Sequence, residues 1–95
     1  MHLRENLLSI IASMPPAFDA HAVILAYARA HQREYIEHLH GYRLETYPFQ
    51  RAHRALGQQI GEICDFLSYT PRPWGNPDSI DIFGQDSGCR AWDKP

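Results

Sequence analysis

The sequence predicts a small, mainly α-helical domain, and three observations support this fold class. Apolar residues recur at three- and four-residue intervals over residues 3–14, 20–40 and 48–67, which is typical of amphipathic helices. Proline or glycine interrupts the chain between these segments. The last quarter of the chain instead contains a proline-rich stretch and a short alternating run. We therefore expect three amphipathic helices followed by a C-terminal extended arm and a short β-hairpin.

The first predicted helix covers residues 3–14 and ends firmly. Two consecutive prolines, Pro15 and Pro16, follow it. Proline donates no backbone hydrogen bond and disfavours the helical conformation of the residue before it. Its apolar face comprises Leu3, Leu7, Leu8, Ile10, Ile11 and Met14.

The second predicted helix, over residues 20–40, has the clearest start. Asp19 is a good N-cap, and Phe18 before it is placed to pack on Val23 as a hydrophobic staple. No glycine or proline follows until Gly41, so we expect one continuous helix of roughly 30 Å.

The third predicted helix, over residues 48–67, has the most regular apolar face. Pro48 suits its first position. Gly57 and Gly61 lie four residues apart and form one small-residue face. Glycine costs a helix about 1 kcal/mol relative to alanine, so close packing there is expected. We favour packing by the first helix over packing by a second copy of the chain.

The C-terminal segment is expected to be extended and then to form a hairpin. Three prolines within residues 71–77 exclude both a helix and a central strand. Residues 79–83 alternate like a strand, residues 84–88 favour a turn, and residues 89–92 supply the return strand. An isolated hairpin is marginal in water, so it should pack on the helices. The contacts are expected from Ile80, Ile82, Phe83 and Trp92.

Composition limits the organisation and the location of the protein. Ninety-five residues with a net charge of −2 correspond to a single domain, residues 1–95. The longest apolar run, residues 22–28, is far too short to cross a membrane. Two cysteines without a CxxC pair favour a cytoplasmic protein. The alternative is an exported protein with a single Cys64–Cys89 disulfide.

The sequence contains no established motif for metal binding or catalysis. His31, Glu34 and His38 share one side of the second predicted helix, and His53 or Cys64 would complete a zinc site. These spacings match no established metal motif, so we predict neither a metal nor another cofactor. No catalytic motif is present, and one small core leaves little room for a pocket of about 300 Å³. We therefore predict a protein that is not an enzyme.

The leading functional hypothesis is a small regulatory module that binds another protein or a second copy of itself. Exposed positions of the second helix and the Arg-Pro-Trp segment supply residue types that are enriched at interface hot spots. The predicted partner-binding residues are Arg33, Glu37, His40, Tyr42, Arg72 and Trp74.

The alternative hypothesis is a DNA- or RNA-binding regulator. Arginine suits contacts with phosphate and guanine, and the predicted contact residues are Arg29, Arg33, Arg51 and Arg54. Three helices followed by a hairpin also resemble the element order of winged helix-turn-helix proteins. The second predicted helix is about twice as long as the scaffold helix of that motif.

Overall fold

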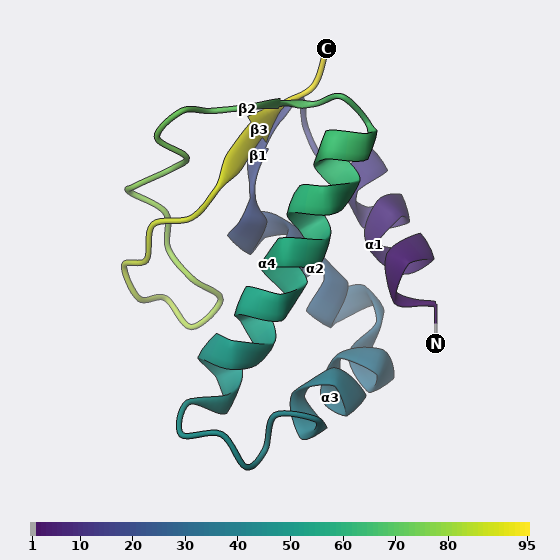
Figure 1. The fold of residues 1–95 in the computed structure, drawn as a ribbon, viewed down its shortest axis with the longest axis vertical. Coiled ribbons are helices and arrows are strands. Elements are labelled where there is room, and N and C mark those ends of the chain that lie inside the picture. The colour runs from purple at the N-terminus through teal and green to yellow at the C-terminus, as the bar shows by residue number, and fades with distance from the viewer. Residues whose placement is uncertain (1) are drawn as a thin grey trace.

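The computed structural model describes residues 2–95 and contains four helices and one small sheet (Figure 1). The helices are α1 (Leu3–Ala12), α2 (Ala20–Ala30), α3 (Gln32–His40) and α4 (Pro48–Phe66). The strands are β1 (Ala17–Asp19), β2 (Thr70–Pro71) and β3 (Ala91–Asp93), arranged in the order β1-β3-β2 with both pairings antiparallel. The predicted mainly α fold with a short antiparallel β element is confirmed.

The continuous helix expected over residues 20–40 is wrong, because the chain breaks it at His31. The backbone of His31 leaves the helical region, with φ −127° and ψ 60°. The break turns α3 so that it packs on α4. There, the Tyr35 hydroxyl lies 2.6 Å from Nε2 of His53, and Nε2 of His38 donates to the Ala52 carbonyl at 2.9 Å. These tertiary contacts outweigh the helix propensity of the sequence.

The ends of the other helices follow the sequence signals. Asp19 caps α2, since its Oδ1 accepts a hydrogen bond from the Ala22 amide at 2.9 Å. Pro48 begins α4, and α1 ends shortly before Pro15. The turn from α1 into β1 also brings the start of α2 against β3, where the Ala20 amide donates to the Arg90 carbonyl at 2.9 Å.

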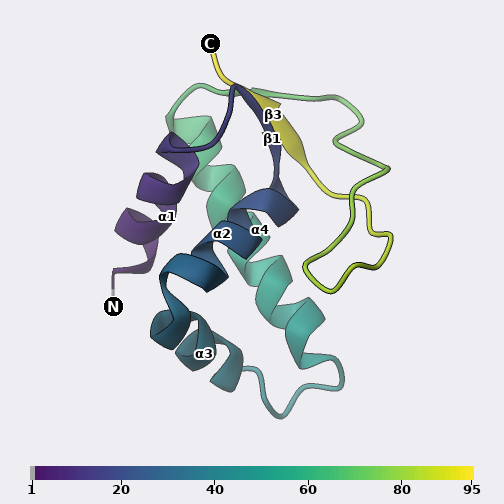
Figure 2. The same ribbon diagram turned by 180° about the vertical axis from the view of Figure 1, so that it is seen from behind.

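The C-terminal segment doubles back on itself, but with strands other than those expected. β2 pairs with β3, and isolated bridges join Asn76 to Cys89 and Ile80 to Asp86. Residues 79–83 and 89–92 therefore do not form the two strands of a regular hairpin. The prolines interrupt the pairing, so the segment is a wide and irregular loop. We call residues 70–93 the C-terminal arm; α2 and α4 pack against each other beside it (Figure 2).

The core lies where α1, α2 and α4 meet beneath β1 and β3. Trp92 of β3 is completely buried, and its ring lies 5.8 Å from that of Phe18, its partner in β1. Of the four expected hairpin contacts, Trp92 is fully buried and Ile82 is half-buried against the core, whereas Ile80 and Phe83 are exposed. Phe83 still contacts α4, because its ring centroid lies 4.8 Å from that of Phe49. The other large core side chains are Leu7, Ile11, Val23, Tyr27, Leu56, Ile60, Ile63 and Cys64.

The two glycines of α4 do not form the helix-packing face that their spacing predicts. A Cβ at Gly61 would collide with the guanidinium of Arg90, which comes from the arm. A Cβ at Gly57 would meet no atom within 4 Å. Gly61 therefore accommodates the Arg90 side chain, whereas Gly57 borders open space.

Both cysteines are free thiols, so the structure contains no Cys64–Cys89 disulfide. Burial raises the pKa of Cys64 to about 11, and the nearby Asp65 carboxylate adds to the shift. This thiol is therefore protonated and unreactive at neutral pH. Across residues 2–95, no helix combines the length and the hydropathy needed to cross a membrane.

Candidate functional site

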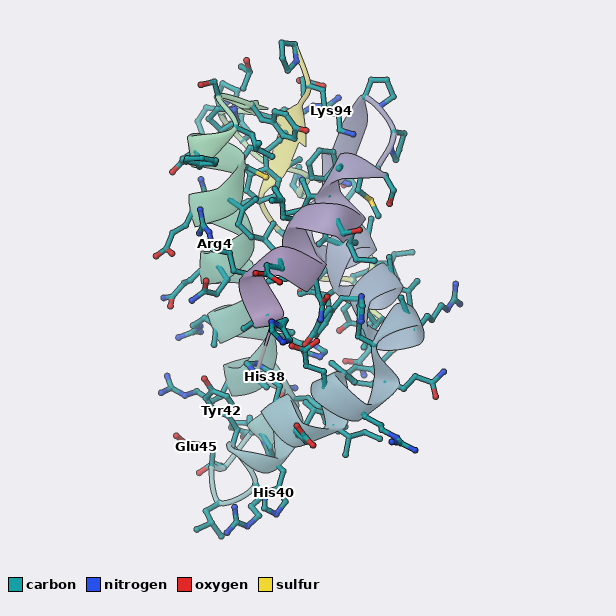
Figure 3. All side chains as sticks on the ribbon, turned by 90° about the vertical axis from the view of Figure 1, so that its right-hand side faces the viewer. Arg4, His38, His40, Tyr42, Glu45 and Lys94 are labelled. Carbon is teal, nitrogen blue, oxygen red and sulfur yellow. The ribbon has the colours of Figure 1, made fainter. Side chains whose placement is uncertain are left out.

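The predicted partner-binding residues fall into two groups that the fold keeps apart. Arg33, Glu37 and His40 are exposed on α3, followed by the half-buried Tyr42. Figure 3 shows His40 and Tyr42 at one end of the molecule and Lys94 at the other. Arg72 belongs to the second end, since it pairs with Asp93, next to Lys94. The six residues therefore do not form one continuous surface.

The arginines predicted to contact nucleic acid are all exposed, but on different helices. Arg29 and Arg33 border a shallow depression at the junction of α2 and α3. Arg51 and Arg54 lie in the first half of α4. Nε of Arg51 is 3.8 Å from a carboxylate oxygen of Glu45, so part of its charge is balanced locally.

Trp74 is the most conspicuous exposed side chain of the arm. It is 88% exposed, in contrast to the fully buried Trp92. The backbone around it is nevertheless held in place: the Arg72 amide donates to the Ala91 carbonyl at 2.9 Å, and the Asn76 amide donates to the Cys89 carbonyl at 2.7 Å. A large indole is thus presented to solvent from an ordered loop.

The arm also contains a groove of about 710 Å³ beside this indole. Its walls come from the two limbs of the arm and are rich in proline. Arg72 borders the groove and forms a two-pronged ion pair with Asp93, with distances of 3.2 and 3.0 Å. The remaining polar side chain of note at the groove is Arg90.

A second hollow lies between α2, α4 and the arm. The expectation that this fold leaves little room for a pocket of about 300 Å³ is therefore wrong. The volume of the hollow is about 470 Å³. The arm creates it, because the loop stands off α4 instead of packing flat on the helix, and Gly57 leaves one wall without a side chain. We call it the histidine pocket after two of its lining residues, His21 and His53.

His21 is held at the pocket by a hydrogen-bonded chain. Oγ of the buried Ser79 donates to Oδ2 of Asp19 at 2.7 Å, and Nδ1 of His21 lies 3.0 Å from the same Oγ. With the hydroxyl proton directed to Asp19, Nδ1 of His21 is the donor to the Ser79 hydroxyl. Burial opposes ionisation of Asp19, but hydrogen bonds from Ser79, Ala22 and Asn76 outweigh it and lower its pKa.

His53 is the second ring of the pocket and is enclosed by aromatic groups. Its plane is within 13° of that of Phe83, with 5.9 Å between centroids, and Phe49 contacts it edge-on at 6.1 Å. Burial lowers the pKa of His53, as do the positive charges that His21 and His38 can bear, whereas Asp81 opposes the shift. The imidazole is therefore mainly neutral at pH 7.

Arginine side chains outnumber acidic side chains around the pocket. Asp81 is its only acidic lining residue, and its Oδ1 accepts hydrogen bonds from the Phe83 and Gln85 amides at 2.9 and 3.0 Å. Arg54 and Arg90 also line the pocket. Within residues 2–95, neither arginine forms an ion pair with an acidic side chain.

The residues considered for zinc do not come together. Oε2 of Glu34 accepts a hydrogen bond from Asn6 at 2.6 Å, and His38 is engaged by the Ala52 carbonyl. Among the described residues, no three His, Cys, Asp or Glu side chains are grouped in a way that would hold a metal ion.

No protein-family model, curated protein or solved structure matches this chain. The exposed Trp74 loop and the histidine pocket must therefore be interpreted from their own geometry. Sequence reasoning identified Trp74 but missed the histidine pocket, whose walls come from three separate segments within residues 20–24, 49–58 and 81–90. The excess of histidine was the only available signal, and it did not indicate which rings converge.

Proposed function

We propose that this chain is a small, non-enzymatic protein-binding module that inserts Trp74 into an apolar cavity of a partner protein. The observation that supports this most directly is an indole 88% exposed on a hydrogen-bonded loop. Burying a tryptophan removes a large apolar area from water, and tryptophan is prominent among interface hot spots.

The order of the loop strengthens the proposal. Association is opposed by the entropy lost when flexible side chains and loops become fixed. Here the flanking prolines and the hydrogen bonds between the two limbs of the arm have already restricted the backbone around Trp74. The adjacent Arg72–Asp93 pair supplies a polar rim, as at known interfaces.

A peptide selection tests this function. A phage-displayed peptide library is panned against the intact chain and counter-selected against Trp74→Ala, and affinities of the selected peptides are then measured by calorimetry. We expect Trp74→Ala to weaken binding by about 30-fold or more, the level of a hot spot. Tyr47→Ala is the matched control, because Tyr47 is an exposed aromatic residue outside the arm.

Retention of affinity by Trp74→Ala would contradict the proposal, as would an equal loss in both variants. Self-association is measured in parallel by sedimentation. A dimer that Trp74→Ala dissociates would identify the partner as a second copy of the chain.

Nucleic-acid binding is a second candidate, and the break at His31 favours it. The break reduces α2 to 11 residues and so removes one departure from the winged helix-turn-helix element order. In that arrangement α4 would present Arg51 and Arg54 to a duplex, and the irregular loop of the C-terminal arm would take the place of the wing. The acidic net charge of −2 places it second.

Salt dependence distinguishes the two candidates. A fluorescently labelled 20-base-pair duplex is titrated with the protein at low and moderate salt, and binding is followed by anisotropy. Phosphate-dominated binding weakens steeply with salt, and the double variant Arg51→Ala, Arg54→Ala should abolish it. Binding that this variant leaves unchanged would eliminate the basic-face hypothesis.

A further inference from the structure

The histidine pocket has the dimensions of a small-molecule site. Its volume of about 470 Å³ lies within the range of ligand pockets, roughly 300–1,000 Å³. The rings of Phe49, His53 and Phe83 form one aromatic wall, with 4.8 Å between the centroids of the two phenylalanines. A flat ring is the shape that such a wall accommodates, because aromatic rings associate in offset-stacked and edge-to-face arrangements.

The polar groups of the pocket are fixed before any ligand arrives. The Asp19–Ser79 pair orients His21, and the Tyr35 hydroxyl lies 2.6 Å from Nε2 of His53. These contacts link the first turn of α2 to the arm and α3 to α4. Side chains oriented in this way bind with less loss of conformational entropy than free ones.

The charge of the pocket favours an anion. Asp81 is the one acidic residue that lines the pocket, and its Oδ1 is already occupied by hydrogen bonds from the Phe83 and Gln85 amides at 2.9 and 3.0 Å. Arg54 and Arg90 have no carboxylate partner among residues 2–95. With one acidic and two arginine residues lining the pocket, positive charge is in excess even when both histidines are neutral.

The wall at Gly57 gives access to this space. Any other residue at this position of α4 would direct a side chain into the surroundings of the pocket, where a Cβ meets no atom within 4 Å. Glycine is unfavourable within a helix, and nothing packs closely against Gly57 to compensate for the cost. An open binding wall accounts for a glycine that the packing of the helices does not require.

We propose that the histidine pocket binds a small anionic ligand with a planar ring, the ring lying on the aromatic wall and the anionic group reaching Arg54 and Arg90. A ring carboxylate and a ring phosphate share this chemistry. Arg90 also borders the groove beside Trp74, but Trp74 does not line the histidine pocket, so the proposal does not depend on the proposed protein-binding function.

The test is an NMR titration of the intact chain with defined probes. The probes are 2-naphthoate, a planar carboxylate, and adenosine monophosphate, a planar phosphate; 2-naphthalenemethanol and acetate serve as the neutral ring and the ringless anion. We expect saturable shifts at His21, His53 and Gly57 with at least one of the first two probes and none with acetate. Comparison of the affinities for the carboxylate probe and the phosphate probe identifies which anionic group the site prefers.

Three variants locate the binding. Arg54→Ala should reduce the affinity for the preferred probe about ten-fold or more, because a charged hydrogen bond is lost. Gly57→Leu should abolish binding by filling the pocket, and its thermal unfolding shows whether it remains folded. Arg43→Ala, which changes an exposed arginine just after α3 and outside the pocket lining, is the matched control and should bind like the wild type.

The proposal is overturned if neither anionic ring compound gives saturable shifts with the folded wild type. Equal binding of 2-naphthalenemethanol, or an Arg54→Ala variant that binds like Arg43→Ala, would refute the anionic part. Undiminished binding by folded Gly57→Leu would place the ligand elsewhere.

Discussion

Ser79 and Asp19 are joined by a 2.7 Å hydrogen bond although 60 positions separate them in the sequence. Oδ2 of Asp19 also accepts a hydrogen bond from Asn76 at 3.0 Å, while Oδ1 caps α2. One carboxylate thus begins a helix and attaches the arm to it. This double use makes Asp19 the point on which the position of the arm and the orientation of His21 both depend.

The first prediction concerns Ser79→Ala. Removing the buried hydroxyl leaves Asp19 and His21 each without one hydrogen bond, so the free energy of unfolding should fall by about 1–3 kcal/mol. Urea denaturation measures this change. Ser9→Ala on the exposed face of α1 is the control and should stay within about 0.5 kcal/mol of the wild type. Equal stability of both variants would show that the hydroxyl does not support the fold.

The two tryptophans are expected to behave oppositely. Trp92→Ala empties the centre of the core and should cost about 3–5 kcal/mol of unfolding free energy. Trp74→Ala removes only a solvent-exposed indole and should change the free energy of unfolding by no more than about 0.5 kcal/mol. Guanidinium denaturation followed by far-UV circular dichroism measures both. A large loss of stability in Trp74→Ala would mean that the indole packs on the protein. This result would remove the basis of the proposed interface.

The helices were predictable wherever the signal is local. Asp19 and Pro48 determine where α2 and α4 begin, and the apolar spacing identifies the buried face of α4. The break at His31 was not predictable, because no residue there disfavours a helix. It arises from contacts of Tyr35 and His38 with α4, which depend on the finished fold.

The same distinction separates the two candidate sites. Trp74 is recognisable from its proline-rich surroundings, which predict an extended segment with its side chains outside. The histidine pocket requires three elements to meet, and no local pattern specifies how far the arm stands off α4. Its residues follow from tertiary structure alone, which is why the sequence led to the expectation of little room for a pocket.

The two glycines of α4 offer a third prediction. Gly57→Ala should stabilise the protein by about 1 kcal/mol, because alanine favours the helix and its Cβ meets open space. Gly61→Ala should stabilise the protein less than Gly57→Ala or destabilise it, because the new Cβ displaces the Arg90 guanidinium. That guanidinium lies 5.1 Å from the ring centroid of Trp92. Thermal unfolding compares the two variants.

A double-mutant cycle isolates this contact. In an Arg90→Ala background the obstruction is absent, so Gly61→Ala should there stabilise by about as much as Gly57→Ala. If Gly61→Ala already stabilises the wild-type background fully, Arg90 does not pack on α4 as described.

The last prediction concerns pH and His53. Its pKa is lowered in the folded state, by burial first and by His21 and His38 next, so between that lowered value and about 6.5 the unfolded chain binds more protons. The free energy of unfolding should therefore fall as the pH drops below 6.5, and this group should contribute no pH dependence above that value. Asp19 and Asp81, whose pKa values are also lowered, act only at more acidic pH, below about 4.

His53→Gln tests the assignment, because glutamine retains a hydrogen-bonding group near the Tyr35 hydroxyl. Urea denaturation between pH 5 and 7.5 should show a shallower loss of stability in this variant than in the wild type. His40→Gln, which changes an exposed histidine at the end of α3, is the control and should lose stability as steeply as the wild type. An unchanged pH dependence in His53→Gln would assign the acid sensitivity to another group and imply that water reaches the imidazole freely.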